Sequence, residues 1–478
     1  MTVEDGTTEA PVVHQIASID RDELEAETLG LTLADGQAIL RELQAAVTVR
    51  QVATWQAQQR LCPVCGRCRP LRGRHRLVYR TVFGTVTLDS ERLRHCSCED
   101  QENSSFSPLA RLLPGRISPE LLYLETKWAS LISYGLAARL LSEVLPLDRP
   151  LRPERMRRHL HQVAQRQEAD LGPEHMPFWQ GCQRNLDALP IPDGPMFVGL
   201  DGGYVRGREG GWFEVIAGKS VLSFRRDDRP ETATTPEKGK CFAFVQTLDE
   251  KPKRRLYEML RGQGLQPNQQ LIFLSDGGDT VRRLQMHLSP EAEHVLDWFH
   301  ITMRLTVLRQ MVKGAALTPA WTEDHLRDLE RIKWLLWNGH ASAAIEAVKD
   351  MEIDIECAAD ADAEELPPPL HKLRNAVADF RTYLGNNAGM IVDYGERYRA
   401  GERISTGFVE SAINQVVGKR FGKSQSMRWT RKGAHLLLQT RTRVLNEELD
   451  HIFRGRYPGF RVPCASAMAQ PPQELHLQ

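Results

Sequence analysis

Two aspartates, Asp201 and Asp276, stand at the ends of short apolar segments and offer the clearest chemistry in the sequence. Asp201 follows the run MFVGL at 196–200, Asp276 follows LIFLS at 271–275, and two glycines come after each. A carboxylate at the end of a buried strand lies at the rim of a sheet, where open sheets bind ligands. Either Asp-Gly-Gly alone could be an ordinary turn between strands. Its repetition within one part of the chain favours a shared site.

A site built from Asp201 and Asp276 would bind a divalent cation. If the two strands are adjacent and parallel, the two carboxylates lie side by side. Like charges at that distance need a cation between them, or one of the two must stay protonated. Ligation by oxygen atoms alone favours Mg²⁺ or Mn²⁺ over zinc.

Glu410 is the third carboxylate that we assign to this site. In the segment RISTGFVESAINQVVGKRFGK, Ser405 or Thr406 can cap a helix on which Glu410 and Asn414 share a face. A dense basic segment follows, and an acid in that position is natural where metal ions and phosphates meet. Without the two aspartates, Glu410 would be read as an ordinary surface residue. The predicted catalytic and metal-binding set is Asp201, Asp276 and Glu410.

The segment Asp-Trp-Phe-His at 297–300 closes a further predicted strand. Asp297 could itself be the second catalytic acid. A structural role is favoured, in which Asp297 and His300 form an accessory pair that orients the site or fixes the strand to the next helix.

Five of the nine cysteines fall between residues 62 and 98. Two short turns, C-P-V-C and C-S-C, supply four soft ligands of the kind that tetrahedral Zn²⁺ prefers. The second pair has one intervening residue rather than two, so Cys68 and His95 are substitute ligands, and the alternative is a set of free thiols. We predict a structural zinc site, with the ligands Cys62, Cys65, Cys96 and Cys98.

Charge is balanced over the whole chain, with 62 basic and 62 acidic residues, but it is unevenly distributed. Residues 60–88 hold seven arginines and no acid, and residues 419–443 hold eight Lys or Arg and no acid. Two basic stretches suit contact with an extended polyanion at two places. Trp429 either stacks on a base or anchors the core. The predicted DNA-binding residues are Lys419, Arg420, Lys423, Arg428, Trp429, Arg431 and Lys432.

An α/β fold is expected to position the acidic residues. Apolar alternation and turn residues predict the order β-β-β-α-β-α-β over residues 195–300, which is the RNase H-like arrangement of a mixed sheet covered by helices. A helical insertion is expected over 301–400. The core then resumes over 401–450 with the helix that carries Glu410 and the basic segment.

The remaining parts of the chain are expected to be smaller modules. Residues 1–60 read as a tail and a helical segment, 61–100 as a zinc-ribbon-like module, 101–172 as a helical region resembling a helix-turn-helix, and 451–478 as a C-terminal tail. No apolar run reaches the ~18 residues of a membrane span. The polar N-terminus is not a signal peptide, so a cytoplasmic location and no membrane partner are expected.

The order of these motifs resembles the mutator-like group of bacterial insertion-sequence DDE transposases, and within it the ISKra type. In that class, one Asp ends the first strand and another ends the fourth; an Asp or Cys with a nearby His follows, and a Glu comes after a helical insertion. This chain has Asp201, Asp276, the 297–300 segment and Glu410 in that order, and its insertion carries Trp334 and Trp337. The resemblance covers roughly residues 197–443.

The resemblance implies a DNA transposase that cleaves and joins strands at insertion-sequence ends. Asp201 would bridge two Mg²⁺ or Mn²⁺ ions, and Asp276 and Glu410 would complete their shells, so that first water and then a DNA 3′-hydroxyl attacks in line. The implied partners are double-stranded DNA, as terminal repeats and target, and further copies of the chain assembled on it. Two alternatives remain open: an RNase H-like nuclease without strand transfer, and a domesticated, non-catalytic DNA-binding regulator.

Overall fold

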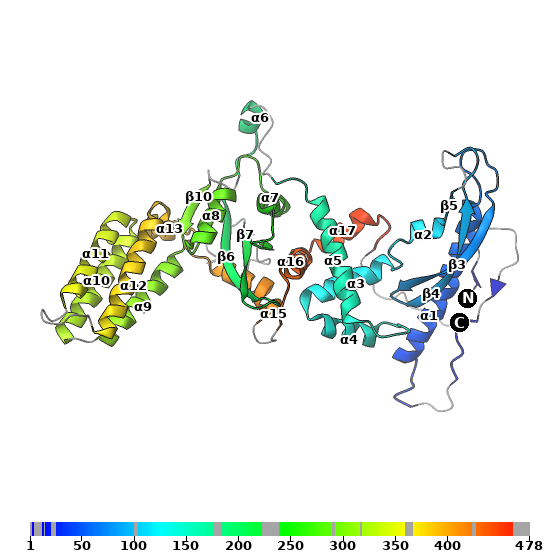
Figure 1. Ribbon diagram of the computed structural model, residues 1–478, viewed down its shortest axis with the longest axis horizontal. Coiled ribbons are helices and arrows are strands. Elements are labelled where there is room, and N and C mark those ends of the chain that lie inside the picture. The colour runs from blue at the N-terminus through cyan, green and yellow to red at the C-terminus, as the bar shows by residue number, and fades with distance from the viewer. Residues whose placement is uncertain are drawn as a thin grey trace, which may run out of the picture. The chain divides into compact units, whose positions relative to one another are not determined.

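The computed structural model describes residues 2–3, 12–13, 15–20, 25–99, 104–174, 183–192, 194–221, 239–288, 292–315, 318–358, 367–422 and 427–461. The chain divides into two compact units, one of residues 1–163 with 447–478 and the other of residues 164–446 (Figure 1). The division falls inside helix α5 (Pro153–Asp170). No helix of the described residues is long and apolar enough to cross a membrane.

The first unit is built around an antiparallel hairpin of β3 (Leu71–Thr81) and β4 (Gly84–Arg94). Buried and exposed residues alternate along β4, as expected of a sheet with one covered face. Helix α1 (Leu33–Gln59) supplies that cover, and its Trp55 packs with Leu88 in the hairpin core. The hairpin turns at Gly84, where φ is 104°, a conformation that glycine adopts readily.

Short helices with strong N-caps complete the first unit. Ser118 caps α3 (Pro119–Leu131), and Pro119 follows at its first position, where a missing N–H costs nothing. The C-terminal helix α17 (Leu449–Arg456) packs on α3, with the rings of Tyr123 and Phe453 5.3 Å apart. The tail expected from residue 451 is therefore wrong for its first part. The other elements of the unit are β1 (Thr2–Val3), β2 (Val12–Val13), β5 (Ser105–Phe106), α2 (Pro108–Leu112), α3 (Pro119–Leu131), α4 (Tyr134–Val144) and α17 (Leu449–Arg456).

A mixed five-stranded sheet forms the centre of the second unit. Its spatial order is β10-β9-β6-β7-β8, with β10, β9 and β6 parallel and β7 and β8 added antiparallel. The five strands follow the predicted order, but the fifth is shorter than expected, because β10 ends at Leu296 and Trp298 to His300 form the first turn of helix α9 (Trp298–Ala315). Their bounds are β6 (Met196–Arg206), β7 (Trp212–Val221), β8 (Lys240–Val245), β9 (Leu271–Ser275) and β10 (Glu293–Leu296).

Helices cover both faces of this sheet. Helix α7 (Pro252–Gln263) ends at Gly264 in the left-handed conformation, and with α8 (Asp279–Leu288) it buries one face. Helix α14 (Gly407–Ile413) packs against β6 and β7, and α16 (Arg431–Leu445) packs against β8. The remaining short elements are α6 (Gln183–Asp187), the π-helical turn η2 (Asn414–Gly418) and α15 (Lys419–Phe421).

The expected helical insertion is a bundle next to the β10 edge of the sheet (Figure 1). Its core is continuous with that of the sheet, through residues such as Leu296 and Ile301. The insertion can therefore hold the sheet edge rigidly. Its elements are α9 (Trp298–Ala315), α10 (Pro319–Trp337), α11 (Ala341–Cys357), α12 (Pro368–Asn386), η1 (Ala388–Met390) and α13 (Tyr394–Arg399).

Candidate functional site

Parallel pairing sets the three aspartates of the second unit at one level of the sheet. β6 pairs with β9 from Met196↔Leu271 to Gly199↔Leu274, and the same register extended by two residues sets Asp201 opposite Asp276. β10 pairs with β9 up to Leu296↔Ser275, and the Asp297 N–H continues the ladder to the Ser275 carbonyl at 2.8 Å. Asp297 therefore stands beside Asp276 in the same way.

Helix α14 brings Glu410 to this sheet because Gly199 leaves room for it. A Cβ at residue 199 would lie 1.9 Å from Val409 Cγ2, a distance that no real structure tolerates. At Gly203, on the same face, a Cβ would meet Val417 at an ordinary 3.6 Å. The helix is thus pressed onto β6 at the residue beside Glu410.

Electrostatics show that these carboxylates act on one another. Burial raises the pKa of Asp201, and the hydrogen bond from the Gly202 N–H opposes this effect. The charges of Asp276 and Glu410 raise the pKa further, while that of His300 lowers it. A raised pKa means that the ionised form is disfavoured unless a cation balances it.

The three carboxylates are near one another without forming a closed ligand cage. Among the described residues, two groups of potential metal ligands have all their donor atoms within 4.8 Å of one another, and Asp201, Asp276 and Glu410 are not one of them. Glu410 is exposed, whereas both aspartates are partly buried. The site is therefore open on the side of the helix.

Asp297 is fully buried and holds its neighbours in place. Its carboxylate accepts hydrogen bonds from the Phe299 N–H at 2.8 Å, from His300 Nδ1 at 2.8 Å and from the Thr406 hydroxyl. The hydrogen bond to Asp297, opposed by burial and assisted by the charges of Asp276 and Asp201, raises the pKa of His300. These contacts fit the accessory role that the sequence favours.

The sequence predicts that Ser405 or Thr406 caps the helix of Glu410. Thr406 is at the N-cap position of α14, but its side chain makes no capping hydrogen bond. Its hydroxyl donates to Asp297 instead. Because the Glu410 N–H bonds the Thr406 carbonyl at 3.1 Å, Asp297 fixes the start of the helix that carries Glu410.

Two further side chains lie at this site, and the sequence alone gives no signal strong enough to identify them. The Tyr383 hydroxyl, from α12, donates to the backbone carbonyl of Asp276 at 2.8 Å, across 107 residues of chain. The carboxylate of Glu214, on β7, lies 2.7 Å from where a Cβ would stand at Gly202. Burial raises the pKa of Glu214, as do the charges of Asp276 and Asp201. An acid within an apolar strand was the available hint for Glu214.

The second basic stretch is only partly a surface. Arg420 is 1% exposed and Trp429 is 9% exposed, with the ring of Trp429 packed 4.8 Å from that of Phe421. Burial of both side chains does not fit their predicted contacts with DNA, and it favours the core-anchor alternative for Trp429. Lys423 lies outside the described residues. The members that do face solvent are Lys419, Arg428, Arg431 and Lys432.

A buried arginine explains the π-helical turn that follows α14. Arg441, on α16, donates to the carbonyl of Val416 at 2.8 Å and to that of Gln415. Burial and the nearby charge of Arg420 lower the pKa of Arg441 to about 10. A wide turn frees backbone carbonyls, and here a guanidinium satisfies them.

The four predicted zinc ligands form a closed cluster in the first unit. All four sulfurs lie within 4.8 Å of one another, with Cys62–Cys98 and Cys65–Cys98 at 3.4 Å and Cys65–Cys96 at 3.5 Å. Tetrahedral zinc with bonds of ~2.3 Å needs sulfurs about 3.8 Å apart. The donor set and its spacing therefore fit zinc.

The turns that carry these cysteines are prepared for thiolates. The backbone N–H of Cys65, above all, and that of Val64 lower the pKa of Cys62. The backbone N–H of Cys98, together with hydrogen bonds from the Cys98 and Cys65 thiols, brings the pKa of Cys96 to about 6, whereas its hydrogen bonds with Cys62, Cys65 and Cys96 raise the pKa of Cys98 well above its usual range. Glu99 accepts the Cys96 N–H at 2.7 Å and pairs with Arg69, which fixes the second turn. The substitutes Cys68 and His95 are not in the cluster.

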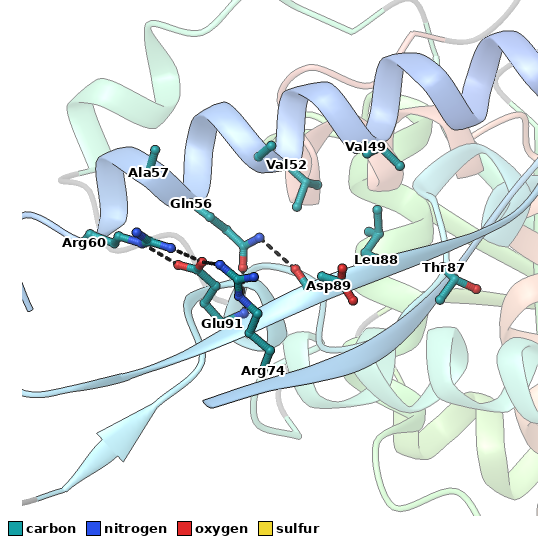
Figure 2. Close-up of a pocket in the computed structure, with 11 residues that line it drawn as sticks. Val49, Val52, Gln56, Ala57, Arg60, Arg74, Thr87, Leu88, Asp89 and Glu91 are labelled. Carbon is teal, nitrogen blue, oxygen red and sulfur yellow. Dashed lines mark hydrogen bonds and ion pairs between the residues drawn. The ribbon is translucent and has the colours of Figure 1, made fainter. Parts of the chain in front are cut away.

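Hydrogen bonds and ion pairs tie the end of α1 to β4, as Figure 2 shows. The Gln56 amide donates to the Asp89 carbonyl at 2.8 Å and accepts the Glu91 N–H at 2.9 Å. The Arg60 guanidinium pairs with the Glu91 carboxylate. Arg60 is two residues before Cys62, so these contacts also fix the position of the first cysteine turn. We assign them a structural role.

The second group of potential ligands is already balanced by an arginine. Glu168, Asp249 and His435 have donor atoms within 4.8 Å of one another. Arg255, 7% exposed, contacts Asp249 at 2.8 Å and Glu168 at 2.9 Å. The guanidinium supplies the positive charge there, so we assign the group to packing of α5, α7 and α16.

No protein-family model matches the chain, and no curated protein matches its sequence. The site is therefore interpreted from its own residues.

Proposed function

We propose that the chain is a DNA transposase that uses Asp201, Asp276 and Glu410 in metal-dependent phosphoryl transfer. The observation that carries the proposal is the parallel register of β6 and β9, which runs to Gly199↔Leu274 and, continued by two residues, sets Asp201 opposite Asp276. The close packing of α14 over Gly199 adds to it. These two features bring a strand-borne pair and a helix-borne carboxylate to one sheet edge from positions far apart in the sequence.

The fold supports this proposal at a coarser level. The order of elements in the second unit is β-β-β-α-β-α-β, and the strands lie in the order β10-β9-β6-β7-β8. We interpret this as an RNase H-like sheet, with α9 to α12 as the insertion before the final helix. Tyr383 of that insertion braces the backbone of Asp276, so the insertion serves the site as well as the core.

The residues present fit one or two divalent cations held by oxygen. Asp201 has a raised pKa through burial and through the charges of Asp276 and Glu410, and a bound cation would relieve that cost. Such ions activate the attacking oxygen and stabilise the departing one. The chain's own part is to hold the carboxylates: Asp297 fixes His300 and the start of α14, and Tyr383 fixes Asp276.

DNA is the substrate class that the charged surfaces fit best. Lys419, Arg428, Arg431 and Lys432 are exposed near the carboxyl side of α14 and at the start of α16. In the first unit, α4 and α5 are joined by a loop in which the Leu151 N–H bonds Ser142 at 2.9 Å. We interpret them as a helix-turn-helix, with exposed Arg157 and Arg158 on its second helix. The cysteine cluster would stabilise this unit with zinc.

The test is cleavage and joining of DNA by the full chain. The substrate is a labelled duplex from the DNA that flanks the coding sequence, where the ends of an insertion sequence would lie, with Mg²⁺ or Mn²⁺. Cleavage followed by joining of the 3′ end to a second duplex is the expected result. Cleavage without joining would support the nuclease alternative, and binding without either reaction would support the regulator.

A further inference from the structure

A cavity of about 480 Å³ lies in the first unit, between the β3–β4 hairpin and the loop that joins α4 to α5. Val78 and Arg80 of β3 stand opposite Thr87 and Thr85 of β4, so these four side chains share one face of the hairpin. All four line the cavity, and the loop and the first turn of α5 line it from the other side. Its volume is in the range of sites that enclose small ligands.

Three arginines line this cavity: Arg80, Arg149 and Arg155. Among the residues that the structure describes, none of these three side chains has a hydrogen bond or an ion pair. Burial and the charge of Arg80 lower the pKa of Arg155, and Glu125 only partly offsets this effect. The Glu125 carboxylate is hydrogen-bonded to His159. The cavity therefore has positive charge that an added anion would balance.

The cavity is held open by contacts that leave the arginines free. Asp148, the acid in its lining, accepts the Thr85 N–H at 2.7 Å and lies 3.5 Å from the Arg41 guanidinium. This carboxylate thus ties the α4–α5 loop to the hairpin. The backbone carbonyl of Arg80 accepts the Ser118 N–H at 2.7 Å, which fixes the strand on the opposite wall. The walls are in place before any ligand arrives.

We propose that this cavity binds one backbone phosphate of the DNA duplex that the first unit contacts. The proposal rests on the DNA substrate of the proposed function and names a contact that would fix the register of α5 on the duplex. Guanidinium groups present N–H donors in a rigid fork that matches the oxygens of a phosphate. The surroundings favour a polyanion over a small free anion. Exposed Arg76 continues the same face of β3, and exposed Arg157 and Arg158 follow on α5.

The experiment measures binding of the full chain to a fluorescein-labelled duplex from the flanking DNA, in Ca²⁺ to prevent cleavage. Arg80→Ala combined with Arg155→Ala should weaken binding about tenfold, by loss of charge-assisted hydrogen bonds. The slope of log affinity against log salt should flatten by about 0.9, the value for one phosphate. The thermal midpoint of the double variant should not fall, because neither side chain has a partner in the chain to lose.

Arg139→Ala is the matched control, since this arginine is exposed on α4, outside the cavity lining, with Glu143 at 3.9 Å. It should leave the affinity and the salt slope unchanged. Ethylation interference on the same duplex should lose one phosphate position in the double variant and none in Arg139→Ala. Parental affinity and slope in the double variant would overturn the proposal.

A free anion is the competing occupant, and inorganic phosphate is its probe. A thermal midpoint that rises with millimolar phosphate in the parent alone, without loss of DNA affinity in the double variant, would assign the cavity to a free anion and overturn the proposal. The outcome is separate from that of the proposed function, because binding in Ca²⁺ does not depend on whether the carboxylates cleave DNA. A chain that needs Arg80 and Arg155 to bind DNA but does not cleave it would support this contact and refute the transposase.

Discussion

The four cysteines and the three carboxylates are both sets of metal-ligand side chains, yet they are prepared to different degrees. All four sulfurs lie within 4.8 Å of one another, while Asp201, Asp276 and Glu410 do not meet that limit. Neutral thiols can approach and hydrogen-bond one another, whereas ionised carboxylates repel. A closed soft cluster and an open acidic one are therefore what the chemistry of the ligands dictates.

The network around Arg255 shows what carboxylates do when a cation is built into the chain. Glu168 and Asp249 come within 4.8 Å of each other there, and the guanidinium contacts both. Around Asp201 the charge that lowers the pKa is that of His300, yet the pKa remains raised. The comparison supports the proposal that Asp201 and its neighbours take up an added cation, and the closed cysteine cluster is compatible with zinc binding.

The largest effect should come from opening the cysteine cluster. Cys65→Ser removes a central sulfur, so zinc affinity should fall and the hairpin unit should lose its order, since structural zinc contributes about 10 kcal/mol or more in small modules. Zinc content by mass spectrometry and hydrogen exchange of β3 and β4 measure this. Cys68→Ser, which changes an exposed cysteine outside the cluster, is the control. Full zinc content in Cys65→Ser would contradict the assignment of Cys65 and its neighbours as zinc ligands.

The packing of α14 against β6 at Gly199 should be the next most sensitive to substitution. Gly199→Ala places a Cβ 1.9 Å from Val409, so the helix must shift and carry Glu410 with it. We expect cleavage to fall about 100-fold, as for a misplacement of ~1 Å, and stability to fall by about 1–3 kcal/mol.

A matched pair of variants checks this cause. Gly203→Ala, whose Cβ would meet Val417 at 3.6 Å, should leave cleavage near that of the parent. Val409→Ala added to Gly199→Ala should restore much of the loss. Equal activity of Gly199→Ala and the parent would show that the position of Glu410 does not matter.

The strands and the acidic ends could be predicted because they rest on local patterns. Apolar runs ending in Asp201 and Asp276 identify the sheet, and a C-x₂-C turn identifies half of the cysteine cluster. What could not be predicted depends on contacts between distant segments. Arg420 reads as a surface residue by composition, and for Trp429 the sequence leaves a base-stacking and a core role open. Both are buried, and the Trp429 ring packs against Phe421 and under the Arg420 guanidinium. Tyr383 reaches Asp276 across the insertion, and no pattern in either segment marks that contact.

Acid should weaken the Arg255 network in a defined pH window. Burial alone would raise the pKa of Glu168, but hydrogen bonds from His435 and Arg255 outweigh it and bring the pKa to about 2, against a usual 4.5. Its ionised form therefore stabilises the fold above pH 4.5, and this contribution is lost as pH falls through about 2. The loss should be on the order of 2 kcal/mol.

Glu168→Gln should abolish that dependence, as measured by the urea midpoint of far-UV circular dichroism at several pH values. Glu346→Gln removes a carboxylate from an exposed pair with Lys349 and should behave as the parent. If both variants kept the dependence of the parent between pH 4.5 and 2, another group would carry the acid response.

The smallest effect should come from the exposed basic residues. Arg428→Glu with Arg431→Glu should weaken DNA binding for many sequences alike. The slope of log affinity against log salt should flatten by about 0.9 for each lost phosphate contact. Fluorescence anisotropy at several salt concentrations measures it. An unchanged slope would remove these residues from the DNA-binding surface.

Cleavage by Asp201→Asn tests the central claim most directly. The substitution keeps the size of the side chain and removes the charge that would hold the cations. Glu410→Gln does the same on α14. Each variant should fold and bind DNA like the parent, and cleavage and joining should both collapse, because one set of ligands serves both steps. The double variant should lose little more than either single one. Full cleavage of the labelled duplex by Asp201→Asn, at parental DNA affinity, would contradict the account.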